Sequence, residues 1–111
     1  MNAMGQLTEA RLARILVLAT LGLSGSPAVA ADVAHGGDLA KRWCASCHLV
    51  EGQQKQANAD LPSFAMIAAS PDFSPEKVAY FLLDPHPKMP SFSLTRSEAS
   101  DIAAYINSLR R

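Results

Sequence analysis

The segment Trp43-Cys44-Ala45-Ser46-Cys47-His48 decides how the rest of this chain is interpreted. Its Cys-x-x-Cys-His spacing is typical of covalent c-type haem attachment. Two thiols three residues apart on one helical turn reach the two vinyl groups on one edge of a porphyrin. The next residue, His48, then lies where its imidazole can bind the iron. The motif therefore predicts one haem c, attached through Cys44 and Cys47, with His48 as an axial ligand.

Three other kinds of site also use a Cys-x-x-Cys pair. A thioredoxin-like redox site needs a preceding strand in a βαβ unit, and the sequence predicts no strand before Cys44. A structural zinc site needs a fuller ligand set, and no second Cys or Cys/His pair lies at ligand spacing. A structural disulfide between Cys44 and Cys47 is the third alternative, since disulfides form in exported proteins.

The first 31 residues have the layout of a secretory signal peptide. Two arginines precede the apolar run 15–23, and small residues in an Ala-x-Ala pattern follow it. The run is shorter than the roughly 20 residues that span a bilayer. We expect cleavage after Ala30 or Ala31, which leaves residues 32–111 as a periplasmic domain without a membrane span. An uncleaved signal would anchor that domain to the membrane instead. Either Met1 or Met4 is the start.

The composition excludes several classes of protein. The chain has 111 residues and a formal net charge of zero, and it contains no basic run and no Gly-rich phosphate loop, so we expect no nucleic-acid partner. The mature domain of about 80 residues is large enough for one small core. A domain of this size usually needs a further stabilising element, such as a disulfide or a bound group. A large apolar cofactor would supply far more core than one disulfide. We expect a monomer.

Apolar periodicity predicts an all-α domain with long loops. The first helix is expected over residues 38–47, with Leu39, Trp43 and Cys47 on one face. A polar, aperiodic loop follows over 50–60. A short helix is then expected over 63–69.

Two further helices carry clear start signals. Ser74-Pro75-Glu76 combines an N-cap hydroxyl, a first-turn proline and an acid, and Asp84-Pro85 ends that helix. Thr95-Arg96-Ser97-Glu98 is a capping box that begins a helix to about Leu109. The inward stripes are expected to be Val78, Phe81 and Leu82 on the third helix, and Ala99, Ile102, Ile106 and Leu109 on the fourth.

The haem motif implies a second axial ligand from elsewhere in the chain. Met89 lies 41 residues after His48, in a stiff loop over 85–94 that contains three prolines. A thioether on such a loop can cross the far face of the ring, so Met89 is the predicted metal ligand together with His48. Met66, on an apolar helical face, and His86, between prolines, are the alternatives. His35 is expected to be solvated.

With these residues in view, the mature chain resembles the small class I cytochromes c of bacteria over residues 34–110. The resemblance rests on the haem motif, Leu61-Pro62-Ser63-Phe64, Lys88-Met89-Pro90 and the closing helix. It implies a cytochrome c-like fold, with three to five helices wrapped around one covalently bound haem. It also implies that the first helix crosses the last near Gly36 or Gly37. By the same resemblance, Pro62 belongs to the cofactor site, because its carbonyl accepts a hydrogen bond from the His48 ring.

These features together predict a periplasmic one-electron carrier rather than an enzyme. With both axial positions filled by His48 and Met89, no iron position is open to a substrate. The expected partners are redox proteins: a dehydrogenase, an oxidase or a reductase. The alternative is a haem enzyme or ligand sensor, peroxidase-like or gas-binding, in which Met89 is labile.

Overall fold

The computed structural model describes residue 25 and residues 29–84 and 88–111 of the chain. Within these residues the regular secondary structure is helical throughout, without a strand, which confirms the all-α prediction. The helices are α2 (Val33–Trp43), α3 (Phe64–Ala69), α4 (Pro75–Leu83) and α5 (Arg96–Ser108). None of the helices in this part of the chain has the length and apolar character that crossing a bilayer requires. The predicted signal segment lies almost wholly outside the described residues.

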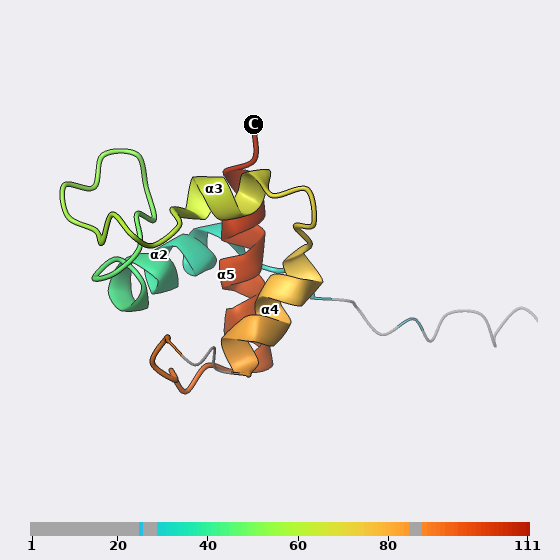
Figure 1. Cartoon of the computed structure of the whole chain (residues 1–111). Coiled ribbons are helices and arrows are strands. Elements are labelled where there is room, and N and C mark those ends of the chain that lie inside the picture. The colour runs from blue at the N-terminus through green and yellow to red at the C-terminus, as the bar shows by residue number, and fades with distance from the viewer. Residues whose placement is uncertain (1–24, 26–28, 85–87) are drawn as a thin grey trace, which may run out of the picture.

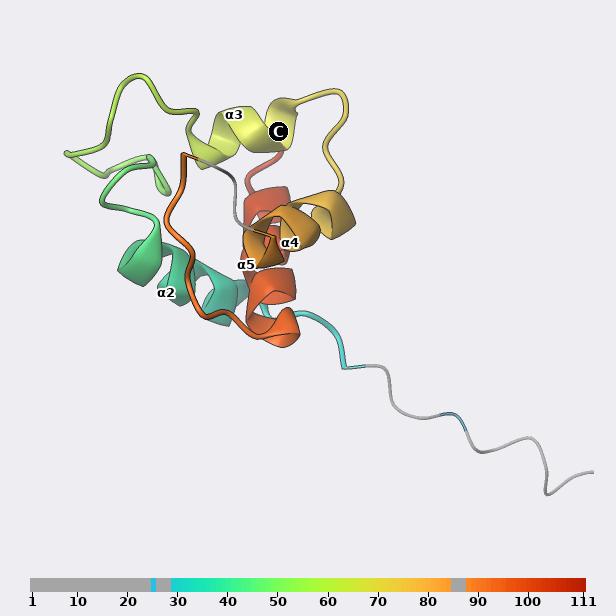
Figure 2. The same cartoon turned by 60° about the horizontal axis from the view of Figure 1, so that its bottom comes forward.

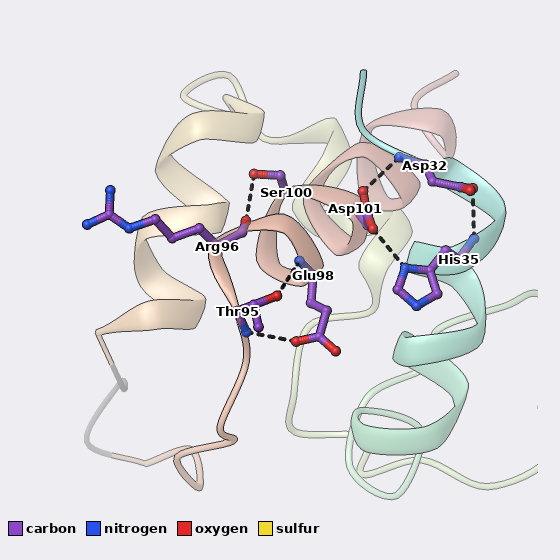
Figure 3. A network of polar contacts seen from close by, with 7 residues as sticks. All are labelled: Asp32, His35, Thr95, Arg96, Glu98, Ser100 and Asp101. Atoms are coloured by element: carbon purple, nitrogen blue, oxygen red, sulfur yellow. Dashed lines mark hydrogen bonds and ion pairs between the residues drawn. The ribbon is translucent and has the colours of Figure 1, made fainter. Parts of the chain in front are cut away.

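Helix α5 is the centre of the fold. It contacts each of the other three helices, with α2 on one side, α4 on another and α3 across its C-terminal end (Figure 1, Figure 2). The predicted capping box is present: Glu98 N donates to Thr95 Oγ1 at 3.2 Å, and Thr95 N donates to Glu98 Oε2 at 2.7 Å (Figure 3). The predicted stripe is confirmed, because Ala99, Ile102 and Ile106 are buried and Leu109 is half-buried against the core.

Helix α2 begins earlier and ends earlier than the sequence predicts. The Asp32 carboxylate accepts a hydrogen bond from His35 N at 3.0 Å and caps the helix, which begins at Val33, five residues before the expected start. The helix ends at Trp43 instead of running to residue 47. Leu39, Trp43 and Cys47 therefore do not share one helical face as expected, since Cys47 lies beyond the end of the helix.

Helices α2 and α5 cross at the two glycines, as the family resemblance implies. A Cβ on Gly36 would overlap the carbonyl group of Asp101 and would lie 2.9 Å from Ile102 N. The α5 backbone therefore rests directly on Gly36, a contact that only a residue without a side chain permits. A Cβ on Gly37 would meet only the Tyr105 ring, at 3.1 Å.

A polar pair closes the N-terminal end of this crossing. His35 Nδ1 lies 2.8 Å from Asp101 Oδ2, and Asp32 N donates to Asp101 Oδ1 at 2.7 Å (Figure 3). His35 is exposed, as expected, with 49% of its side chain accessible, and it is in addition hydrogen-bonded to Asp101. Its hydrogen bond to the Asp101 carboxylate raises the pKa of His35. Burial disfavours the Asp101 carboxylate, but its hydrogen bonds from His35 and Asp32 outweigh burial, and the pKa of Asp101 is lowered.

Helices α3 and α4 are short, and α4 is capped as predicted. Ser63 Oγ accepts from Met66 N, and Ser74 Oγ accepts from Lys77 N, with Pro75 in the first turn of α4. Helix α3 buries Phe64 and Ala68, but α4 has no buried residue at all. The predicted α4 stripe is thus only partly buried: Val78 and Leu82 are half-buried and Phe81 is 60% exposed.

Candidate functional site

A cavity of about 420 Å³ lies between α5, α4, α3 and the Cys-x-x-Cys-His turn. Its volume is in the range of small-molecule and cofactor sites. The lining is mainly apolar and aromatic. It includes Trp43, Leu61, Phe64, Ile67, Val78, Phe81, Leu82, Phe92 and Ile106. All three residues of the stripe predicted for α4 line this cavity, and Val78 and Leu82 also pack against the buried core.

Two cysteine thiols lie at the cavity wall in different surroundings. Residues 44–47 form turns after α2, in which Cys47 N and His48 N both donate to the Cys44 carbonyl, at 3.1 and 2.9 Å. Cys44 is 5% exposed, whereas Cys47 is exposed. Burial raises the pKa of the Cys44 thiol to about 11. The reactive thiol of a thioredoxin-type site has a lowered pKa, and burial acts in the opposite direction at Cys44.

The imidazole of His48 lines the same cavity and is fixed through one nitrogen. Nδ1 lies 2.8 Å from the Pro62 carbonyl oxygen, so it is the protonated nitrogen that donates to this acceptor. The contact expected from the family resemblance is therefore present. The ring centroids of His48 and Phe64 lie 5.7 Å apart, which adds a packing contact. With Nδ1 engaged, Nε2 is the nitrogen that remains for coordination.

Met89 lines this cavity too and is half-buried. Met66, the alternative sulfur ligand, is 66% exposed and is not part of the cavity wall. His86 falls within residues 85–87, outside the described residues. The structure thus brings Cys44, Cys47, His48 and Met89 around one space.

The segment 88–95, which leads into α5, supplies the cavity wall at Lys88, Met89, Pro90 and Phe92. The rings of Trp43 and Phe92 lie 5.7 Å apart and tilted by 45°. Figure 2 shows this segment running past α2 on its way to α5. The aromatic contact ties the residues around Met89 to the start of the cysteine motif, although the two are far apart in sequence.

One residue at this site was missed at the sequence level. Gln54 lies in the polar loop after the motif, which was predicted to be an ordinary surface loop. Its side chain instead makes hydrogen bonds to the backbone of Ala45 and His48, both inside the motif. A single glutamine in an aperiodic polar segment carries no signal that distinguishes it from its neighbours Gln53 and Gln56.

Clusters of three or more His, Cys, Asp or Glu side chains that would suit a metal ion do not occur in the described part of the chain. The four-ligand zinc alternative therefore gains no support.

Comparison with known proteins agrees with this geometry. The sequence profile of the family described as cytochrome c oxidase, cbb3-type, subunit III matches residues 31–106. Cytochrome c-552 of Bradyrhizobium diazoefficiens is 68% identical over 95 residues, which cover 86% of this chain and 90% of the relative. Cytochrome c6 of Nostoc sp. is 31% identical over 84% of this chain and 90% of the relative. Cytochrome c6 of Synechococcus sp. is 33% identical over 86% of this chain and 85% of the relative.

No solved structure matched the chain. The relatives are electron carriers and not enzymes, and the Cys-x-x-Cys spacing is consistent with covalent haem c. The chain therefore belongs to the mono-haem class I cytochromes c.

Proposed function

We propose that this protein is a periplasmic one-electron carrier in which Cys44 and Cys47 hold one haem c covalently and His48 and Met89 are the axial ligands. The observation that carries the proposal is the convergence of these four side chains on one apolar cavity. The chemistry of the donors fits the group: two thiols at vinyl-reaching spacing, an imidazole with Nδ1 already engaged, and a thioether. When bound, the haem supplies a one-electron ferric–ferrous couple.

The protein's own residues adjust the reduction potential of that couple. A thioether is a neutral, soft ligand, so Met89 favours ferrous iron and raises the reduction potential relative to a second imidazole. Aromatic and aliphatic walls such as Phe64 and Leu82 act in the same direction, because an apolar environment disfavours the extra positive charge of ferric iron. The Pro62 carbonyl, which accepts a hydrogen bond from Nδ1–H, fixes the tautomer and the orientation of the His48 imidazole.

The surface around Cys47 is the proposed place of electron exchange. Cys47 is exposed while Cys44 is buried, so the wall of the cavity near Cys47 is the one that partners can approach. Trp43 and Phe81 lie on the cavity rim and are 42% and 60% exposed. A largely apolar rim on a chain with no net charge suits short-lived encounters with redox proteins better than strong electrostatic steering.

The periplasmic location rests on the signal-like segment 1–31. The described helical domain begins at the N-cap Asp32, so cleavage after Ala30 or Ala31 removes no part of it. Mass spectrometry of the exported protein tests this directly, because it gives the cleavage position and the haem mass together. A full-length chain recovered in the membrane fraction would contradict the cleaved, periplasmic form.

The ligand assignment is tested by Met89→Ala, with Met66→Ala as the matched control. In a host with a cytochrome c maturation system, both variants should keep one covalent haem per chain by pyridine haemochrome. Only Met89→Ala should lose the near-infrared methionine-to-ferric-iron charge-transfer band and bind added imidazole. Met66 is 66% exposed and outside the cavity, so its variant should match the parent. A parent protein with five-coordinate, high-spin haem would favour the enzyme or sensor alternative.

A further inference from the structure

Gln54 makes an unusually large number of hydrogen bonds for a loop residue. Its Oε1 accepts from Val50 N at 2.9 Å. Its Nε2 lies 2.8 Å from both the Ala45 and the His48 carbonyl oxygens and 2.6 Å from the Gln56 carbonyl oxygen. An amide has only two N–H groups, so one of them is shared between two acceptors. The amide orientation is fixed by these partners, since the opposite one would face three carbonyls with an oxygen.

Two of these acceptors, the Ala45 and His48 carbonyls, belong to the haem motif. A helical turn that ends leaves its last carbonyls without partners from the helix itself. In this turn the Cys47 carbonyl accepts from Asn58 N at 2.9 Å. The Ala45 and His48 carbonyls are the ones that accept from Gln54. The side chain of Gln54 thus does for the motif what a C-cap does for an ordinary helix.

Gln54 also connects the motif to the centre of the fold. Val50, whose N–H is held by Gln54 Oε1, is 1% exposed. The Val50 carbonyl accepts from Tyr105 Oη on α5 at 2.8 Å. A continuous line of hydrogen bonds therefore runs from α5 through Val50 and Gln54 to the His48 backbone.

We infer that Gln54 is a positioning residue for His48, an inference that rests on the proposed function because it assumes that His48 is the axial ligand. The backbone of His48 is held by Gln54, and its ring is held by the Pro62 carbonyl and by packing on Phe64. These contacts act at different ends of the residue, so together they fix where the imidazole lies in the cavity. Loss of the Gln54 contact frees the backbone end and loosens the ring end with it.

Gln54→Glu tests this role, with Gln53→Glu as its matched control. The two variants make the same change of charge one residue apart, but Gln53 is exposed, whereas Gln54 is half-buried against the motif. In Gln54→Glu the carboxylate still accepts from Val50 N but presents an oxygen, in place of a donor, to three carbonyls. The measurement is made on the haem-loaded protein, by NMR exchange of the His48 Nδ1 proton and by the hyperfine-shifted His48 ring resonances.

We expect the His48 Nδ1 proton to exchange about tenfold faster in Gln54→Glu than in Gln53→Glu, as one or two lost hydrogen bonds would produce. The His48 ring resonances should also shift in Gln54→Glu alone. Should Gln54→Glu fail to mature, Gln54→Asn, which keeps the amide but shortens it by one methylene, should show the same changes more weakly.

The positioning role is overturned if the Gln54 variants lose thermal stability while their His48 exchange and resonances match those of Gln53→Glu. That result would leave Gln54 a purely structural loop residue and would leave the proposed function intact. A parent protein that carries no covalent haem, or whose His48 ring shows no hyperfine shift, overturns the proposed function itself and this inference with it.

Discussion

The two sides of α5 are built in opposite ways. On the side of α2, small residues bring two backbones into direct contact, and the interface is sealed by side chains such as Leu39 and Ile102, which are 7% and 0% exposed. On the side of α4, the partner helix has no buried residue, and its apolar side chains line a cavity. Yet α4 has the higher mean hydropathy of the two partner helices.

This difference shows what each side is specified to do. A helix–helix contact needs close approach and shape complementarity, which Gly36 and Gly37 provide at the cost of hydrophobic area. A cofactor wall needs large apolar side chains that face a space between the helices, which Val78, Phe81 and Leu82 provide. The α2–α5 contact should therefore be intolerant of added volume, and the α4 side should be sensitive to lost area that faces the cavity.

Adding one methyl group at the helix crossing should have the largest effect. In Gly36→Ala the new Cβ overlaps the Asp101 carbonyl group, so the helices must separate, and we expect a loss of about 3 kcal/mol in the free energy of unfolding. Gly37→Ala is the matched control, because it gains the same helix propensity but meets only the movable ring of Tyr105. Chemical denaturation of the haem-loaded proteins measures both. Equal stabilities for the two variants would show that the crossing is not closely packed.

Two neighbouring aromatic residues on α4 test the other side. Phe81 is 60% exposed and Tyr80 is 65% exposed, so exposure alone predicts similar effects of substitution. Only Phe81 lines the cavity. In the haem-loaded protein we expect Phe81→Ala to lower the free energy of unfolding by about 2 kcal/mol and Tyr80→Ala by less than about 0.5 kcal/mol. Matching losses in denaturant titrations would mean that Phe81 does not cover the cofactor.

Much of the fold could be predicted from sequence because its signals are local. The capping box at Thr95, the Ser74-Pro75 start and the α5 stripe each depend on a few neighbouring residues, and each is present in the structure. The start and end of α2 could not be predicted in the same way. Its cap at Asp32 lies beside the expected cleavage point, and its buried face follows the glycines, which apolar periodicity does not count.

The candidate site likewise contains residues that the sequence could predict and residues that it could not. Cys44, Cys47 and His48 are recognisable because their spacing itself expresses the chemistry, and Met89 because few sulfur donors lie downstream. Gln54 was missed because its role depends on where its amide lies in space, between carbonyls nine and six residues earlier in the chain. The hydrogen bond between His35 and Asp101 was missed for the same reason, since its partners are 66 residues apart.

A smaller effect is expected for the link between α5 and the motif loop. Tyr105 Oη donates to the Val50 carbonyl at 2.8 Å, and this bond joins the tightly packed side of the fold to the cavity side. Tyr105→Phe keeps the ring in place against Gly37 and removes only the donor, so we expect a loss of about 1 kcal/mol in the free energy of unfolding. Tyr80→Phe, at an exposed position, is the control and should change stability little. A Tyr105→Phe protein as stable as the parent in denaturant titrations would show that the link contributes nothing.

The smallest effect is a pH dependence confined to the α2 side. The pKa of His35 is raised above 6.5 by its hydrogen bond to Asp101, and the nearby carboxylates of Asp32 and Glu98 act in the same direction. A raised pKa in the folded state means that the stabilisation is complete below pH 6.5 and is lost as the pH rises through the folded-state value. The pKa of Asp101 is lowered below 3.8, so its own contribution is present above that pH and is lost as the pH falls. The pair therefore stabilises the crossing most between these two values.

His35→Gln isolates this effect, because glutamine can still donate to Asp101 but does not titrate. Between pH 6 and pH 8 we expect the melting temperature of the parent to fall relative to that of His35→Gln, by a small amount since the His35 side chain is 49% exposed. Other titrating groups are common to both proteins and cancel in the difference. If the melting temperatures of the two proteins change in parallel across this pH range, the hydrogen bond between His35 and Asp101 holds equally well with a neutral imidazole. The hydrogen bond alone, without the charge, would then account for how this end of the α2–α5 crossing is held.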